Sequence, residues 1–203
     1  MPTGRFAPSP TGDLHLGNLR TALLAWLFAR SAGSRFLVRV EDLDPVTSDT
    51  GHEARQLADL AALGLDWDGP VIRQSARRGR HEEMLAALVA RGLTYPCFCS
   101  RREVREAAAA PHVTPGTYPG TCRDLGPAER AEREASGRPA ALRLRASGER
   151  VTVRDRLHGE ITRPADDIVL RRNDGIVAYH LAVVVDDHDQ GVEEVVRGDD
   201  LLD

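Results

Sequence analysis

The stretch RFAPSPTGDLHLGN, residues 5–18, decides the fold of this chain. The run from Thr3 to Ala7 is predicted to be a strand, and the Pro, Ser and Gly residues of 8–12 are typical of a turn. From Leu16 onward apolar residues recur at helical spacing, and Gly33 is predicted to end that helix. Such a strand–turn–helix junction can bind phosphate through the unpaired N–H groups of the first helical turn. On local grounds alone, an ordinary connecting loop is the better interpretation.

Strand-like and helix-like segments alternate over the first 91 residues. RFLVRVED at 35–42 is predicted to be a strand, and residues 50–53 (TGHE) fit a capping box that begins a helix reaching about Leu63. A strand and turn at 66–75 precede an amphipathic helix at 77–91. The alternation predicts a parallel sheet with helices on its faces.

The pattern changes near Tyr95. Residues 96–165 are rich in arginine, glycine and proline, and their short alternating segments predict a smaller inserted α+β region. The stretch 167–179 is typical of a hairpin, because two apolar runs flank Asn-Asp-Gly. The following run at 181–191, LAVVVDDHDQG, fits either a strand or a buried helix.

Composition excludes several classes of protein. The chain has 203 residues, 41% hydrophobic and 29% charged, which is ordinary for a globular protein. No apolar run approaches the roughly 20 residues that span a bilayer, and the N-terminus lacks a signal-peptide pattern. Three cysteines, an odd number, argue against a disulfide framework. We therefore expect a cytoplasmic protein with no membrane partner.

Charge is distributed unevenly along the chain. Residues 101–172 carry 15 arginines against 11 acidic residues, whereas residues 173–203 carry one arginine against nine. The middle third is therefore the best candidate for a nucleic-acid-binding face, although any single arginine is more often part of a solvated surface. All 27 basic residues are arginine, so this chain alone cannot supply a catalytic lysine.

The full string R-x-A-P-S-P-T-G-x-L-H-L-G-N resembles the first signature of class I aminoacyl-tRNA synthetases in its glutamyl and glutaminyl form. The four residues 15–18 stand at the place of the HIGH motif. The resemblance continues through residues 39–45 (RVEDLDP), 179–188 (YHLAVVVDDH) and 195–201 (VVRGDDL), so it covers essentially the whole chain.

The resemblance implies an α/β fold, a Rossmann-like parallel sheet with an inserted α+β zinc-containing subdomain. Residues 1–95 would form the first half of the nucleotide-binding domain. Residues 96–165 would form the inserted subdomain that faces the acceptor, and residues 166–203 would return to the catalytic domain.

The resemblance also implies a pocket for L-glutamate after the first strand. Arg5 would bind the side-chain carboxylate, because a guanidinium fork matches a planar carboxylate, and Glu41 would receive the α-ammonium group. The whole implied glutamate set is Arg5, Phe6, Ala7, Pro8, Ser9, Glu41, Tyr179 and Arg197. The implied ATP-binding and catalytic residues are His15, Gly17 and Asn18, which would stabilise charge at the attacked α-phosphate, with Mg²⁺ accompanying ATP.

Two acidic clusters, residues 41–44 and 186–188, suggest a divalent metal as an alternative. Acidic pairs are common at strand ends and in loops, and neither cluster carries a spacing typical of a metal site. We therefore interpret both as ordinary carboxylates.

Two further features are similar to the glutamyl-Q tRNA(Asp) synthetases, the short branch of this family. Val183 stands where glutamyl-tRNA synthetases commonly carry asparagine, and a C-x-C pair is followed by Y-x3-C. That branch implies one structural Zn²⁺ held by Cys97, Cys99, Tyr118 and Cys122. From chemistry alone His112 would be the fourth ligand, since imidazole is a far commoner zinc ligand than phenolate, and three buried free thiols are the plain alternative.

The implied reaction is ATP-dependent formation of glutamyl-adenylate and transfer of glutamate to the queuosine base of tRNA(Asp), by a monomer. The lysine-containing second signature of the class is absent, so we expect a truncated chain that keeps the glutamate pocket and adenylates poorly by itself. The alternatives are the catalytic N-terminal part of a glutamyl-tRNA synthetase and a non-catalytic module that binds glutamate or nucleotide.

Overall fold

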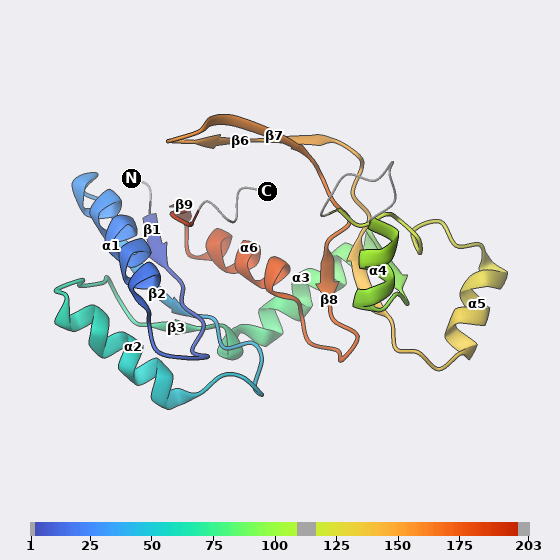
Figure 1. Ribbon diagram of the computed structural model, residues 1–203, viewed down its shortest axis with the longest axis horizontal. Helices are drawn as coiled ribbons and strands as arrows, with labels where there is room; N and C mark the ends of the chain where they lie inside the picture. Colours follow the sequence, from blue (N-terminus) through green and yellow to red (C-terminus); the bar gives the residue numbers. More distant parts are fainter. Residues whose placement is uncertain (1–2, 109–116, 199–203) are drawn as a thin grey trace. The chain divides into compact units, whose positions relative to one another are not determined.

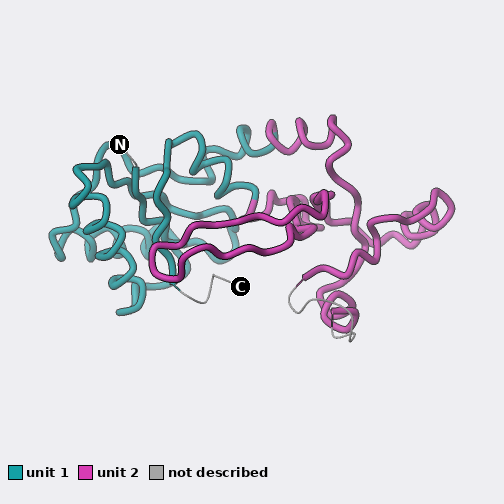
Figure 2. Tube along the Cα trace, turned by 90° about the horizontal axis from the view of Figure 1, so that it is seen from above, with its two compact units in different colours: residues 1–82, 181–203 teal, residues 83–180 magenta. Residues whose placement is uncertain are grey.

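The computed structural model describes residues 3–108 and 117–198. The chain divides into two compact units (Figure 2): residues 1–82 together with 181–203, and residues 83–180. The functional division at 95/96 and 165/166 stays a prediction, because compactness alone does not test which segment performs which role.

The first unit is built on a four-stranded parallel sheet, as the alternation predicts. Its strands are β1 (Thr3–Phe6), β2 (Phe36–Val40), β3 (Ile72–Arg73) and β9 (Val192–Glu194). They lie in the order β3-β2-β1-β9, and each neighbouring pair is parallel. The first strand therefore lies inside the sheet, with β2 on one side and β9 on the other (Figure 1).

Helices α1 (Leu16–Ser31), α2 (Thr50–Ala62), α3 (Arg78–Ala90) and α6 (Tyr179–Asp189) connect these strands, with a short 3-10 turn, η1 (Gln74–Arg77), before α3. The ambiguous segment at 181–191 is thus mainly helical. The capping box expected at 50–53 is wrong by one residue, because Asp49 is the N-cap of α2. Its carboxylate accepts hydrogen bonds from the N–H groups of Gly51 and His52.

Helix α1 packs on the sheet through alanines. Its buried residues are Ala22, Ala25 and Ala29, while four leucines of the apolar pattern are exposed, Leu16, Leu23, Leu24 and Leu27. Small side chains are required because the helix lies close to β1. A Cβ at Gly4 would lie 3.1 Å from the Ala29 Cβ. Close approach, rather than hydrophobicity, selects the face that α1 presents to the sheet.

The two faces of the sheet have different characters, because successive side chains of a strand alternate between faces. One face carries Phe6, Phe36 and Val38, which form a core with the α1 alanines and Leu60 of α2. The other face carries Arg5 and Arg39, which contact α6. The apolar core and the charged groups are therefore separated by the thickness of the sheet.

The second unit contains two small antiparallel sheets. Strands β4 (Thr94–Cys97), β5 (Ala141–Leu144) and β8 (Val169–Arg171) form one, and β6 (Arg150–Asp155) pairs with β7 (Gly159–Pro164) in the other. The expected hairpin after β8 is present as an antiparallel bridge from Arg171 to Val177. Helices α4 (Arg101–Ala108) and α5 (Pro127–Ala135) complete the unit. In the part of the chain that the structure describes, no helix has the length and apolar character to cross a membrane.

Candidate functional site

The carboxyl ends of the parallel strands lie at one edge of the first unit's sheet. The turn at 7–12 follows β1, Glu41 follows β2, and Arg197 lies shortly after β9. The neighbours of β1 lie on opposite sides of it, one reached through α1 and the other only after the second unit. In open α/β sheets, ligands bind in the crevice at such a reversal of strand order.

The turn after β1 is held by three other segments of the first unit. The Gln56 side-chain amide of α2 donates to Ser9 O at 3.0 Å and to Gly12 O at 2.7 Å. The N–H of Glu41 donates to Pro8 O, and that of Asp49 donates to Pro10 O. Gln56 was missed by the sequence reasoning, although a polar residue on the apolar face of α2 was a usable signal. The turn is a fixed structure rather than a free loop.

His15 is the N-cap of α1. Its Nδ1 accepts the N–H of Gly17 at 3.0 Å, and the Asn18 side-chain oxygen accepts the N–H of His15 at 3.2 Å. In the neutral ring the proton therefore lies on Nε2, which is left to donate outward from an exposed side chain. A Cβ at Gly17 would lie 2.9 Å from the His15 ring, so glycine is needed for this arrangement. The three residues predicted for ATP thus form one interlocked helix cap.

Arg5 and Glu41 are joined through Arg39 and Asp187, neither of which the sequence analysis assigned to the glutamate pocket. Asp187 of α6 accepts from Arg5 Nε at 3.3 Å and from Arg39 Nη1 at 2.6 Å. Arg39 also donates to the Glu41 carboxylate at 3.2 Å, and it is fully buried. Arg5, Arg39, Glu41 and Asp187 form a connected charged cluster on the face of the sheet opposite the apolar core. We call it the Arg39 cluster.

Burial governs the protonation of Glu41. Loss of solvation raises the pKa of its carboxyl group above the ordinary value, against the opposing effect of the positive charges of Arg39, Arg5 and Arg197. The resemblance assigns Arg197 to the same site as Glu41, and that assignment stays a prediction. The two carboxylates of the Arg39 cluster differ in exposure as well, since Asp187 is 16% exposed and Glu41 6%.

The remaining residues expected to bind glutamate fall in different surroundings. The Phe6 side chain lies in the apolar core, so only its backbone faces the strand edge. Pro8 is buried, Ala7 is half-buried and Ser9 is exposed. Tyr179 begins α6 and belongs to the second unit, where its ring contacts His180 edge-on; its part in the site stays a prediction.

The acidic clusters considered as metal sites are engaged by protein groups. Asp42 accepts from the N–H and the hydroxyl of Ser75, and Asp44 accepts from the N–H of Val46. Asp186 is fully buried among Gln74, Arg77 and His81. Their carboxylates serve the fold of the first unit.

In the second unit the four residues predicted to bind zinc converge. The Tyr118 hydroxyl lies 3.3 Å from Cys97 Sγ and 3.6 Å from Cys99 Sγ, and Cys99 Sγ lies 3.5 Å from Cys122 Sγ. The three sulfurs lie within 4.8 Å of one another, and none is in a disulfide. Sulfurs around tetrahedral zinc lie roughly 3.8 Å apart, given a Zn–S bond of about 2.3 Å. The donors and their spacing therefore fit this metal. His112 lies outside the described residues.

Burial and hydrogen bonding shift the pKa values of the proposed zinc ligands in different directions. Burial raises the pKa of Cys99 to about 12, and the pKa of Tyr118 is raised in the same way. Burial acts to raise the pKa of Cys97, but its hydrogen bonds with Tyr118 and with the nearby Arg143 outweigh burial and lower it. A bound divalent cation would favour the ionised forms of all four groups.

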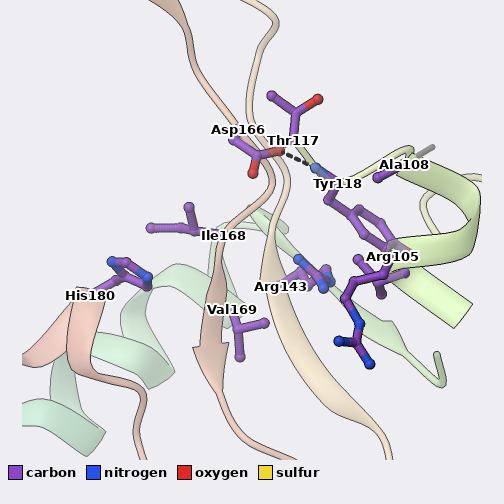
Figure 3. A pocket seen from close by; sticks show the side chains of 10 residues that line it. Arg105, Ala108, Thr117, Tyr118, Arg143, Asp166, Ile168, Val169 and His180 are labelled. Atoms are coloured by element: carbon purple, nitrogen blue, oxygen red, sulfur yellow. Dashed lines mark hydrogen bonds between the residues drawn. The ribbon is translucent and has the colours of Figure 1, made fainter. Parts of the chain in front are cut away.

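A pocket of about 520 Å³, lined by both apolar and charged side chains, borders this cluster (Figure 3). Tyr118 and Arg143 line it, and the Arg143 guanidinium carbon lies 3.7 Å from the centre of the Tyr118 ring. Asp166, which accepts the N–H of Tyr118, lies on the same wall, and His180 lies across from them. The pocket was not foreseen from the sequence, because its lining comes from five separate segments.

Comparison with known proteins identifies relatives over the whole chain. Residues 3–203 match the family model of the catalytic domain of class I tRNA synthetases (E and Q). A glutamyl-Q tRNA(Asp) synthetase of Nocardia farcinica is 66% identical over 98% of this chain and 63% of its own length. Glutamate–tRNA ligase 2 of Chelativorans sp. is 49% identical over 98% of this chain and 42% of its own.

A solved structure agrees with these matches. The crystal structure of a glutamate tRNA ligase from Elizabethkingia meningosepticum, in complex with its amino acid, superposes with a TM-score of 0.80 and 31% identity. It covers 99% of this chain and 44% of the ligase. The chain thus spans less than two thirds of the length of each of these three proteins.

Proposed function

The chain belongs to the class I tRNA synthetases for glutamate and glutamine, and from this membership we propose that it serves ATP-dependent activation of L-glutamate and transfer to the queuosine base of tRNA(Asp). The observation that carries the proposal is the Arg39 cluster, which presents Arg5 and Glu41 together at the carboxyl edge of a parallel sheet.

The Arg39 cluster offers glutamate two sites of opposite charge. Arg5, Arg39 and Asp187 together carry one positive charge, which matches the side-chain carboxylate of the substrate. Glu41 carries one negative charge, which matches the α-ammonium group. A neutral side chain such as that of glutamine would leave the positive charge uncompensated, and such an unpaired buried charge is unfavourable.

ATP would bind beside this pocket, at the N-terminus of α1. The first-turn N–H groups and the His15 Nε2–H are donors suited to phosphate oxygens, and ATP would enter with Mg²⁺. The substrate α-carboxylate attacks the α-phosphate, pyrophosphate leaves, and glutamyl-adenylate forms. The acceptor nucleoside then attacks the acyl carbon and AMP leaves. Positioning and electrostatic stabilisation account for this chemistry, since the substrate is its own nucleophile.

Cys97, Cys99, Tyr118 and Cys122 would hold one structural Zn²⁺ in the second unit. When bound, the metal would cross-link β4, the segment before α4 and the 118–122 turn, and it would take no part in the chemical step. Three free thiols in this arrangement also support a reducing, cytoplasmic location, where we propose that the protein acts as a monomer.

Two candidates remain for the tRNA that accepts the glutamate. Val183, buried in α6, and the C-x-C…Y-x3-C pattern favour the glutamyl-Q branch, as does the 66% identity to the Nocardia protein. The match to the Chelativorans glutamate–tRNA ligase supports transfer to tRNA(Glu) instead.

Transfer assays with the complete protein distinguish these candidates. We expect glutamate to be transferred to tRNA(Asp) that carries queuosine, but not to the same tRNA lacking it. Charging of tRNA(Glu) would instead establish the second candidate. Calorimetric titration of the 203-residue chain with glutamate, with glutamine as the matched control, tests the pocket separately. Absence of glutamate binding by the folded chain would support a non-catalytic module.

A further inference from the structure

The Arg5 guanidinium is held along one edge only. Its Nε and Nη2 lie 3.3 and 3.4 Å from the two carboxylate oxygens of Asp187, which is a side-on pairing. Within residues 3–108 and 117–198, no hydrogen bond reaches the third nitrogen, Nη1. The end-on edge, formed by Nη1 with the second hydrogen of Nη2, is therefore available to a second carboxylate.

Asp187 is itself held in place by Arg39. Arg39 donates to it at 2.6 Å, which is much shorter than either contact that Asp187 makes with Arg5. Arg39 is fully buried, and its other terminal nitrogen binds Glu41, so its position is set by two carboxylates. Asp187 is thus anchored mainly by Arg39, and Arg5 pairs with an acid that is already in place.

Asp187 also offsets the repulsion between two buried positive charges. Arg5 and Arg39 are both almost completely buried, and their like charges would repel without the carboxylate between them. The long contacts to Arg5 leave much of its attraction for another anion, whereas a short bidentate pair would compete with the substrate.

We propose that Asp187 is a positioning residue for glutamate recognition: it holds the side-on edge of Arg5, so that the end-on edge faces the side-chain carboxylate of the substrate. This inference rests on the proposed function. Asp187 does not touch the substrate in this role; it acts through Arg5, and Arg39 keeps it in place. None of the residues predicted from the sequence motif performs this task.

The test is a double-substitution cycle in the 203-residue chain, with glutamate affinity measured by calorimetry. Asp187→Asn keeps the shape but loses the charge and one acceptor, and it is expected to weaken binding about tenfold. Arg5→Lys keeps a positive charge but has no side-on edge. In that background, Asp187→Asn is expected to change the affinity by no more than roughly twofold, because little remains for Asp187 to orient.

Asp189→Asn is the matched control, because Asp189 lies on the same helix and binds Arg77 and Arg80 instead. It is expected to leave glutamate affinity unchanged. If Asp187→Asn does not fold, Asp187→Glu preserves the charge while its extra methylene displaces the carboxylate, and it should show the same dependence on Arg5.

Two results would overturn the proposal: an undiminished affinity in the Asp187 variant, or an equal loss in both Arg5 backgrounds, which would indicate a merely structural role. Failure of the unsubstituted chain to bind glutamate would remove the proposed function, and this inference with it. Binding by the unsubstituted chain without dependence on Asp187 would remove the inference alone.

Discussion

The two units differ in how they combine a core with a site. In the first unit, eight buried apolar residues form a core on one face of the sheet, and the Arg39 cluster lies on the other. In the second unit, the buried cluster contains five residues, Tyr95, Cys97, Phe98, Tyr118 and Cys122, and three of these are proposed metal ligands. The second unit therefore uses the same side chains as core and as donor set. Its stability should depend on its site, whereas that of the first unit should not.

Removal of the metal should have the largest effect, because it should destabilise the second unit and leave the first unit folded. Structural zinc contributes on the order of 10 kcal/mol to small domains that depend on it. We expect a chelator, or Cys122→Ser, to abolish amide protection of β4, β5 and β8 while leaving β1 and β2 protected. Hydrogen exchange with mass spectrometry measures both units in one sample.

Addition of Zn²⁺ should restore protection after chelation but not in the Cys122 variant. Tyr118→Phe removes only the phenolic oxygen, and it should weaken zinc binding if Tyr118 is a ligand. If His112→Ala loses the metal and Tyr118→Phe does not, histidine is the fourth ligand. Protection that is indifferent to chelation in the zinc-loaded protein would show that the second unit does not depend on the metal.

A smaller effect is expected in the core of the first unit. Ala29→Leu would force α1 away from Gly4, where the Ala29 Cβ already bounds the space, and should lower the free energy of unfolding by about 2 kcal/mol. Leu24→Ala, on the exposed face of the same helix, should change it by less than about 0.5 kcal/mol. Urea denaturation of both variants makes the comparison. Equal effects would contradict the alanine-packed interface.

The same interface shows which feature of the fold could not be predicted from the sequence, namely the buried face of α1. Alternating segments were sufficient for the parallel sheet, because alternation and connection length constrain how strands can pair. They did not identify the buried face of α1, since hydropathy ranks leucine above alanine. The choice depends on Gly4, which lies on a different element. The segment at 181–191 was ambiguous for a related reason: its valines favour a strand, and its helical state is decided by burial against the sheet.

For the site, the motif named Arg5, Glu41 and His15 as binding residues, which stays a prediction, but it could not show how Arg5 and Glu41 are connected. Asp187 lies 182 residues from Arg5 and 148 from Arg39. Contacts over such separations depend on the chain returning to the sheet after the second unit, and no local spacing reports them. The convergence of the cysteines was more accessible, because all four predicted donors lie between residues 97 and 122, in a C-x-C pair and a Y-x3-C pair.

The start of α1 allows a subtler comparison between two glycines, Gly12 in the preceding turn and Gly17 in the first turn of the helix. Gly17→Ala should displace the His15 ring, since its Cβ would lie 2.9 Å from it, and should cost about 1 kcal/mol of helix capping. At Gly12 a Cβ would meet nothing within 4 Å, so Gly12→Ala is the matched control. Nitrogen-15 NMR of the imidazole should report an Nε2–H tautomer in the unsubstituted chain and in the Gly12 variant, and a mixture in the Gly17 variant. An unchanged tautomer after Gly17→Ala would contradict the steric argument.

The smallest expected effect contrasts one carboxylate from each unit. Burial raises the pKa of Glu41 above its ordinary value, whereas Glu103 in the second unit has a pKa of about 2, because it accepts the N–H of Ser100 and pairs with Arg138. Carbon-13 NMR titration of the two side chains should therefore give midpoints on opposite sides of the ordinary value of 4.5.

Their contributions to stability have opposite signs. The contribution of Glu103 is present above the unfolded pKa and is lost as the pH falls toward 2, whereas that of Glu41 is present below the unfolded pKa and is lost as the pH rises through its folded value. Protonation of Glu41 favours folding but opposes substrate binding, because only the ionised carboxylate attracts the ammonium group of glutamate. Glutamate affinity should therefore begin to fall on acidification while Glu103 is still fully ionised. If the affinity for glutamate instead falls only as Glu103 titrates, Glu41 does not bind the ammonium group of the substrate. The charges of the Arg39 cluster would then contribute to folding alone.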